Sequence, residues 1–278
     1  MSIVAPEELV PLLLGRIEQE QARLIDEYHH PVGTTTRHFT IDDLLPKAVA
    51  DEISAAFPRD PETFHKRKSL AEQKKTSANL SSYDPLLSHI TYAIQHPEVV
   101  NAVAAVTGIT TLEPDPLLYA GGLSLMSQGD FLNPHVDNSH DGTRARYRRL
   151  NLLYYVTPDW NVENGGNFEL WDESRTVPKT IVSRFNRLVV METNKTSWHS
   201  VSKVVADRSR CCVSNYFFSQ ESPDGTDYFH VTSFDGRPDE TLKHAVLTAD
   251  SVARNVLGKV LKTGRGKSLI NKNKQKTD

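Results

Sequence analysis

The first hydrophobic positions of the chain recur at intervals of three and four residues, which is the spacing of one face of an α-helix. They extend from Val10 to Tyr28, and the helix breakers Pro31 and Gly33 follow. We therefore predict a helix over about residues 6–29, which either packs on the main domain or serves as a dimerisation arm. Similar spacing predicts helices over residues 46–57, 85–96, 97–107 and 238–262.

From about residue 117 the pattern changes to short apolar runs that are separated by Gly, Asn, Asp and Pro. Together with a short strand at Arg37–Leu44, the predicted strands are Leu117–Met126, Arg149–Val156, Asn167–Trp171, Thr180–Val182, Arg187–Glu192 and Cys211–Ser219. Many short strands with frequent turns are typical of a β-sandwich or jelly roll and not of a βαβ sheet. The predicted fold class is α+β, with a helical N-terminal layer on an all-β core.

Residues 59–83 lie between these two regions and lack a clear periodicity. They contain a basic cluster within residues 64–75, which is either a solvated loop or a mobile lid over a site. We divide the chain into an N-terminal helical arm (1–36), a main domain (37–235, with a β core at about 117–220) and a C-terminal helix with a basic tail (236–278). The last ten residues are expected to be disordered.

Composition narrows the class of protein. The chain has 278 residues and a net charge of −3, from 32 basic and 35 acidic side chains, so no specific nucleic-acid partner is expected. The two cysteines, Cys211 and Cys212, are adjacent, which excludes a disulfide scaffold and suggests a reducing compartment. The apolar run Leu9–Leu14 is too short to cross a membrane. We expect a soluble, cytoplasmic protein.

Three residues suggest a metal site. His135 and Asp137 are two positions apart, so in a strand their side chains share one face. His199 follows another predicted strand. Two histidines and one carboxylate form the ligand set of non-haem Fe(II) oxygenases. A His-x-Asp pair alone is a weak signal, so a zinc site or a non-catalytic binding module stays an alternative at this point.

Arg210 opens a strongly apolar strand that contains no acidic residue. A guanidinium that points into a barrel needs an anionic partner, and a ligand carboxylate would fit its geometry; the alternative is an arginine at the barrel mouth that faces water. Arg208 lies on the same face but nearer a turn, where we expect it to be exposed. Asn151 and Tyr155 share one face of their strand, and an inward tyrosine hydroxyl would bond either a ligand or the backbone.

Several motifs occur in a fixed order along the chain. They are Asn133–Asn138 (NPHVDN), Leu152–Trp160 (LLYYVTPDW), Asn164–Leu170 (NGGNFEL), Arg184–Val190 (RFNRLVV) and Trp198–Val201 (WHSV), with Phe39–Pro46 (FTIDDLLP) upstream. In this order they resemble the 2-oxoglutarate/Fe(II)-dependent dioxygenase superfamily, on the prolyl-4-hydroxylase-like branch that includes the hypoxia-type enzymes.

The resemblance implies a double-stranded β-helix in which His135, Asp137 and His199 hold Fe(II). It also implies 2-oxoglutarate and O2 as co-substrates, with ascorbate as a further candidate cofactor. Arg210 would pair with the distal carboxylate of 2-oxoglutarate and Tyr155 would bond the same group, with Asn151 as a further candidate contact. In the family this arginine often lies nine residues after the second histidine, which here is Arg208. We prefer Arg210 as the 2-oxoglutarate contact, because the aromatic run that ends at Phe218 follows Arg210 at the distance along the chain that is usual in the family.

The implied activity is hydroxylation of an unactivated C–H bond, most similar to prolyl hydroxylation of a peptide or protein. The alternative substrates are a small metabolite, a free amino acid, or a glycan or lipid head group. The segment Ser139–Arg149 is longer than in the hypoxia-type enzymes and contains four arginines. With residues 64–75 it is predicted either to form a basic gate for an acidic or phosphate-bearing substrate or to be a plain surface loop. The sequence leaves the oligomeric state open.

Overall fold

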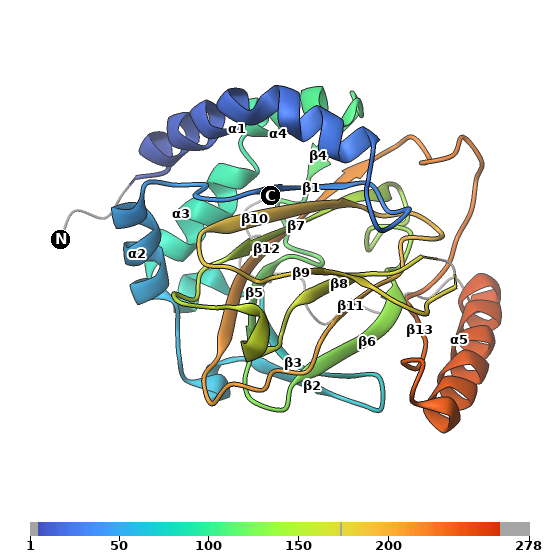
Figure 1. Ribbon diagram of the computed structural model, residues 1–278. Helices are drawn as coiled ribbons and strands as arrows, with labels where there is room; N and C mark the ends of the chain where they lie inside the picture. Colours follow the sequence, from blue (N-terminus) through green and yellow to red (C-terminus); the bar gives the residue numbers. More distant parts are fainter. Residues whose placement is uncertain (1–4, 173, 262–278) are drawn as a thin grey trace.

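The computed structural model describes residues 5–172 and 174–261 and contains one large antiparallel sheet with helices on its outer sides (Figure 1). The helices are α1 (Pro6–His29), α2 (Lys47–Ala56), α3 (Pro85–Ile94), α4 (Pro97–Thr107) and α5 (Thr241–Leu261), with short 3-10 helices at Pro61–Thr63, Leu80–Ser82 and Val162–Asn164. Within the described ranges, no helix has the length and apolar character that crossing a membrane requires.

The strands form a continuous curled sheet in the order β1-β10-β7-β12-β5-β3-β6-β11-β8-β9, with β13 added to β6, β2 to β3 and β4 to β12. Their bounds are β1 (His38–Ile41), β2 (His65–Lys68), β3 (Glu72–Ser77), β4 (Glu113–Pro114), β5 (Gly122–Met126), β6 (Phe131–Val136), β7 (Tyr147–Tyr155), β8 (Phe168–Leu170), β9 (Lys179–Ile181), β10 (Arg187–Glu192), β11 (His199–Val201), β12 (Arg210–Ser219) and β13 (Ser233–Phe234). The predicted jelly-roll, double-stranded β-helix class is confirmed.

Two hydrophobic cores lie on the two faces of this sheet. Strand β7 shows why, because its side chains alternate between the faces. Leu152 and Tyr154 belong to the core that packs against the helices, whereas Leu153 and Tyr155 belong to the core inside the curl. This is the alternation that the sequence predicts.

The four N-terminal helices cover the outer face of the sheet, and α5 lies beside β13 on another side (Figure 1). Helix α1 is built into the outer core through its apolar stripe, and Leu13 and Tyr28 on it are fully buried. The stripe packs on α3, α4 and β1. Helix α4 begins at Pro97 as predicted and ends at Gly108, whose φ of 72° favours glycine.

The expectation of irregular structure over residues 59–83 is wrong. Strands β2 and β3 form a hairpin here, and β3 is inserted into the sheet between β5 and β6. The stretch is rich in lysine, so it lacks the apolar alternation that marks a strand. Its backbone nevertheless pairs with two neighbours, which only the tertiary arrangement supplies.

Other boundaries also differ from the predictions. The predicted strand Leu117–Met126 is shorter and begins at Gly122, because Leu118 has a positive φ of 51°. Strands β6 and β11, which carry two of the candidate ligands, were not predicted as strands of their own. Helix α5 agrees with the predicted C-terminal helix. The basic tail beyond residue 261 lies outside the described residues.

Candidate metal centre

Strands β6 and β11 bring the two candidate histidines together. His135 and His199 are directly opposite one another in the antiparallel pair, and their ring centroids are 4.0 Å apart. Each ring is fixed by its Nδ1, which lies 3.0 Å from the Asn133 carbonyl in His135 and 2.9 Å from the Ser197 carbonyl in His199. A carbonyl accepts only from a protonated Nδ1, so the Nε2 atom of each ring carries the free lone pair.

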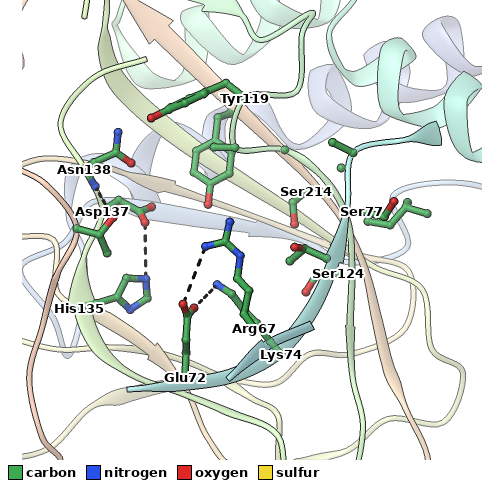
Figure 2. Close-up of a pocket in the computed structure, with 18 of the residues that line it drawn as sticks. Arg67, Glu72, Lys74, Ser77, Tyr119, Ser124, His135, Asp137, Asn138 and Ser214 are labelled. Carbon is green, nitrogen blue, oxygen red and sulfur yellow. Dashed lines mark hydrogen bonds and ion pairs between the residues drawn. The ribbon is translucent and has the colours of Figure 1, made fainter. Parts of the chain in front are cut away.

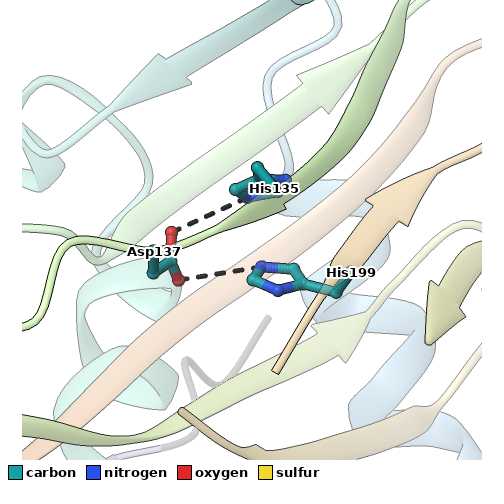
Figure 3. Close-up of side chains that lie close together, drawn as sticks. All are labelled: His135, Asp137 and His199. Carbon is teal, nitrogen blue, oxygen red and sulfur yellow. Dashed lines mark ion pairs between the residues drawn. The ribbon is translucent and has the colours of Figure 1, made fainter. Parts of the chain in front are cut away.

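Asp137 completes the cluster immediately after β6 (Figure 3). One carboxylate oxygen lies 3.7 Å from His135 Nε2, and the other lies 3.7 Å from His199 Nε2. The candidate ligand atoms of all three residues lie within 4.8 Å of one another. Two imidazoles and one carboxylate fit Fe(II) and leave open coordination positions.

The environment keeps each residue in the protonation state that a metal requires. Burial lowers the pKa of both His135 and His199, so the imidazoles are neutral. Burial alone would raise the pKa of Asp137, but the positive charge of the neighbouring Arg148 guanidinium is the largest of the opposing effects, which together hold that pKa well below the usual value. The cluster is therefore ready to bind a cation without losing protons.

Arg210 and Tyr155 form a second polar group inside the curl. Arg210 is 3% exposed, and its guanidinium carbon lies 5.0 Å from the centre of the Tyr155 ring. Its Nη1 donates to the Met126 sulfur, a weak acceptor, at 2.9 Å. Arg210 Nε and the Tyr155 hydroxyl are buried, and neither has a hydrogen-bond partner in residues 5–172 and 174–261. Among the described residues no carboxylate forms an ion pair with Arg210, so the pair fits a ligand carboxylate.

The two remaining candidates lie apart from this pair. Arg208 is exposed, as expected, and donates to the Pro158 carbonyl. Asn151 is buried on the same face of β7 as Tyr155, with its Oδ1 unpartnered. It is four residues from Tyr155 along the strand, about 13 Å at the usual rise per residue. The structure therefore brings Arg210 and Tyr155 together but not Asn151.

A pocket of about 860 Å³, open to solvent, reaches the metal cluster (Figure 2). Besides His135 and Asp137 it is lined by Arg67, Glu72 and Lys74 of the predicted basic segment 64–75, by Arg148 of the segment Ser139–Arg149, and by residues that sequence reasoning did not assign to the site, such as Tyr119 and Tyr216. The alternation of Glu72, Lys74 and Thr76 could have indicated a polar strand face. No local sequence signal marks Arg148.

The two segments of the predicted basic gate differ in their surroundings. Arg67 and Lys74 of residues 64–75 line the pocket, whereas several charges of Ser139–Arg149 have partners within the fold. Arg148 and His140 are buried, and Arg146 forms ion pairs with Asp141 and Glu113. Arg144 stacks on the Phe229 ring at 3.7 Å. Arg146 and Arg148 thus have acidic partners, while the aromatic partner of Arg144 is distant in sequence, so spacing alone could not show these contacts. That the two segments act together as a gate stays a prediction.

Residues 121–218 match the family model of the 2OG-Fe(II) oxygenase superfamily. The fold and the site agree with this match: residues 121–218 have the sequence pattern of the 2-oxoglutarate/Fe(II) oxygenase superfamily, and the same part of the chain holds the His–Asp–His cluster. Oxygenases of this class use Fe(II), 2-oxoglutarate and O2. The predicted resemblance to prolyl-4-hydroxylases agrees in fold with two solved structures.

Similarity to individual proteins agrees with this class. A 95-residue stretch, 31% of the chain, is 34% identical to Prolyl 3-hydroxylase OGFOD1 of Xenopus laevis, and it covers 19% of that protein. The chain thus spans about a fifth of the length of this curated relative. A prolyl-4-hydroxylase of Pseudomonas putida has a similar fold, with a TM-score of 0.53, 16% identity, and coverage of 71% of this chain and 97% of that one.

A second solved structure has the same fold. It is a prolyl hydroxylase from Trichoplax adhaerens in complex with a peptide of the hypoxia inducible factor oxygen degradation domain. The TM-score is 0.51 at 13% identity, and the match covers 74% of this chain and 92% of the other.

Proposed function

We propose that this chain is a 2-oxoglutarate- and Fe(II)-dependent hydroxylase that acts on a prolyl residue of a peptide or protein. The observation that carries the proposal is the combination of two sites in one curled sheet. The His135–Asp137–His199 cluster lies at an open pocket, and the buried pair of Arg210 and Tyr155 has no anionic partner among the residues that the structure describes.

In this proposal His135, Asp137 and His199 hold Fe(II). Arg210 donates to the distal carboxylate of 2-oxoglutarate, and the Tyr155 hydroxyl donates to the same group. Bound Fe(II), with 2-oxoglutarate and O2, supplies the oxidising power that inserts oxygen into an unactivated C–H bond. The protein holds the ligands in place, excludes water from the inner core and presents the substrate through the open pocket.

The prolyl specificity rests on the relatives. Both the curated relative and the two structures of similar fold are named as prolyl hydroxylases. The open pocket is consistent with an extended polypeptide as well as with a small molecule. A cytoplasmic location and a requirement for ascorbate stay predictions.

The direct test is turnover by the purified full chain with Fe(II), 2-oxoglutarate and a panel of proline-containing peptides. We expect release of succinate together with a mass gain of one oxygen atom on proline. Oxygen incorporation into a free amino acid, metabolite, glycan or lipid head group, with none into any peptide, would contradict the prolyl assignment. Absence of 2-oxoglutarate turnover under all conditions would contradict the oxygenase assignment.

The metal assignment has its own test. His135→Ala, Asp137→Ala and His199→Ala should each abolish Mn²⁺ binding measured by calorimetry, because each removes one of three ligands. Far-UV circular dichroism should show that the fold is retained. His30→Ala is the matched control, because His30 is an exposed histidine at the end of α1 and forms an ion pair with Asp26, which is also exposed. Undiminished Mn²⁺ binding by the Asp137→Ala protein would show that the metal site lies elsewhere.

A further inference from the structure

The β2–β3 hairpin forms the wall of the pocket that faces the metal cluster (Figure 2). Alternate residues of β3, namely Glu72, Lys74 and Thr76, line the pocket, and Arg67 of β2 joins them. Lys75 points to the other side of β3, where its ammonium lies 2.6 Å from an Asp130 carboxylate oxygen. The charged side chains of the hairpin therefore lie on two sides: Lys75 pairs with Asp130 away from the pocket, whereas Arg67, Glu72 and Lys74 line it.

Two cations are directly opposite one another on the pocket side. Arg67 and Lys74 are paired across the two strands. Like charges in this arrangement destabilise a sheet unless an anion lies between them. Glu72 supplies the only carboxylate of the hairpin on this wall, and it forms an ion pair with each cation. Its oxygens are 3.3 Å from Lys74 Nζ and 4.0 Å from Arg67 Nη1.

The described pocket lining consequently carries more positive than negative charge. Arg148 is engaged by Asp137, which leaves two hairpin cations for one carboxylate. The side chains of Arg67 and Lys74 are only 29% and 21% exposed, so water does not fully screen them. Arg67 Nε is buried and has no hydrogen-bond partner within the described part of the chain. A second carboxylate would balance this wall.

We propose that Arg67 and Lys74 form a subsite for a substrate carboxylate, so that the hydroxylated polypeptide has an acidic residue near the target proline. This inference rests on the proposed function and specifies its substrate class. Arginine offers a two-pronged contact to a carboxylate and lysine adds a point charge, which together favour Asp or Glu over their amides. Glu72 holds the two cations in place when no substrate is bound.

The experiment compares matched peptides that differ only in Glu or Gln, with this residue moved one position at a time away from the proline. At one or more positions, the unmodified enzyme should favour the Glu peptide by roughly tenfold in kcat/KM, as expected for a partly buried charged contact. The preference should weaken as salt is raised. Because this comparison changes only the peptide, it does not depend on the folding of any variant.

Protein variants then locate the subsite. Arg67→Gln and Lys74→Gln should each reduce the preference for Glu over Gln. Lys68→Gln is the matched control, because Lys68 is an exposed lysine on the same hairpin that does not line the pocket, and it should retain the full preference. Arg67→Glu should shift the preference toward a peptide with Lys at the same position.

The outcomes separate the two proposals. Hydroxylation of Glu and Gln peptides at equal rates at every position would overturn the acidic subsite and leave prolyl hydroxylation intact. A rise in the KM for 2-oxoglutarate in the Arg67 and Lys74 variants, with peptide preference unchanged, would assign the pair to the co-substrate and also overturn the subsite. Failure of every peptide, acidic ones included, would refute both the prolyl function and the subsite.

Discussion

At the scale of single residues, Arg148 is the contact that most directly controls the metal cluster. Its Nη1 lies 3.0 Å from the Asp137 carboxylate, its Nη2 donates to Asn138 Oδ1 at 2.8 Å, and its guanidinium stacks on Tyr216. A guanidinium that holds one oxygen of Asp137 leaves the other oxygen for the metal. Arg148 thus acts as a positioning residue in the proposed mechanism.

Replacement of Arg148 should therefore weaken metal binding. Arg148→Gln is expected to lower Mn²⁺ affinity by about 10- to 100-fold, the usual effect of losing a partner of a ligand. Calorimetric titration measures this directly, without turnover. Arg146→Gln is the control, because Arg146 pairs with Asp141 and Glu113 and does not contact Asp137. Equal affinities in the two variants would remove Arg148 from this role.

A second residue-scale prediction separates Arg210 from Arg208. Arg210→Ala should raise the KM for 2-oxoglutarate by roughly 30-fold to several thousand-fold, since truncating one member of a buried charge pair costs about 2–5 kcal/mol. Mn²⁺ affinity should change little, because Arg210 is not a ligand candidate. Arg208→Ala should have a small effect, since Arg208 is exposed. The opposite order of the two KM values would make Arg208 the anchor.

At the scale of elements, helix α5 holds strand β13 against the metal cluster. The Phe234 ring stacks on His135 at 5.2 Å, and β13 pairs with β6. Ser251 of α5 accepts from the Phe234 amide and donates to the Phe234 carbonyl, both at 2.9 Å. The C-terminal helix thus contributes to fixing a metal ligand that is more than 100 residues away in sequence.

Loss of this contact should loosen β13. Ser251→Ala removes two hydrogen bonds to the backbone, so we expect a loss of about 1–3 kcal/mol of unfolding free energy. Hydrogen exchange at the Phe234 amide should also become faster. Val252→Ala is the control on the same helix, because Val252 is 61% exposed. If the two variants had equal stability and equal exchange, α5 would not restrain β13.

At the scale of the whole molecule, several buried histidines make stability depend on pH. Burial is the main cause that lowers the pKa of five of them: His38, His135, His140, His199 and His230, the last to about 4. Below about pH 6.5 the unfolded chain takes up these protons and the folded chain does not. Folding therefore becomes less favourable as pH falls.

The metal-free protein should accordingly be most stable near and above neutral pH. As the pH falls below about 6.5, the free energy of unfolding should fall, by up to about 1.4 kcal/mol per pH unit for each of these histidines. Urea unfolding at a series of pH values measures this slope. His230→Gln should make the slope shallower, because one such group is removed. A stability that is flat between pH 7 and about 5 would contradict the prediction.

The sequence by itself determined the periodic features of this protein. The alternation in β7 predicted which side chains enter each core, because a strand has a strict period of two. The helical stripe of α1 and the proline at the start of α4 were likewise local signals. The pairing of His135 with Asp137 followed from their spacing, and the order of the motifs indicated the class.

Only the tertiary structure decided which polar residues face the site. The β2–β3 hairpin joins the sheet through backbone hydrogen bonds, which leave no mark on a lysine-rich sequence. Arg148 became a partner of Asp137 because its strand turns it toward the cluster. The exposure of Arg208 was expected from its position near a turn, whereas the burial of Arg210, which the sequence left open, depends on where β12 enters the sheet. Contacts between residues distant in sequence decide where a charged side chain lies, whereas the periodicity of a helix or strand depends only on neighbouring residues.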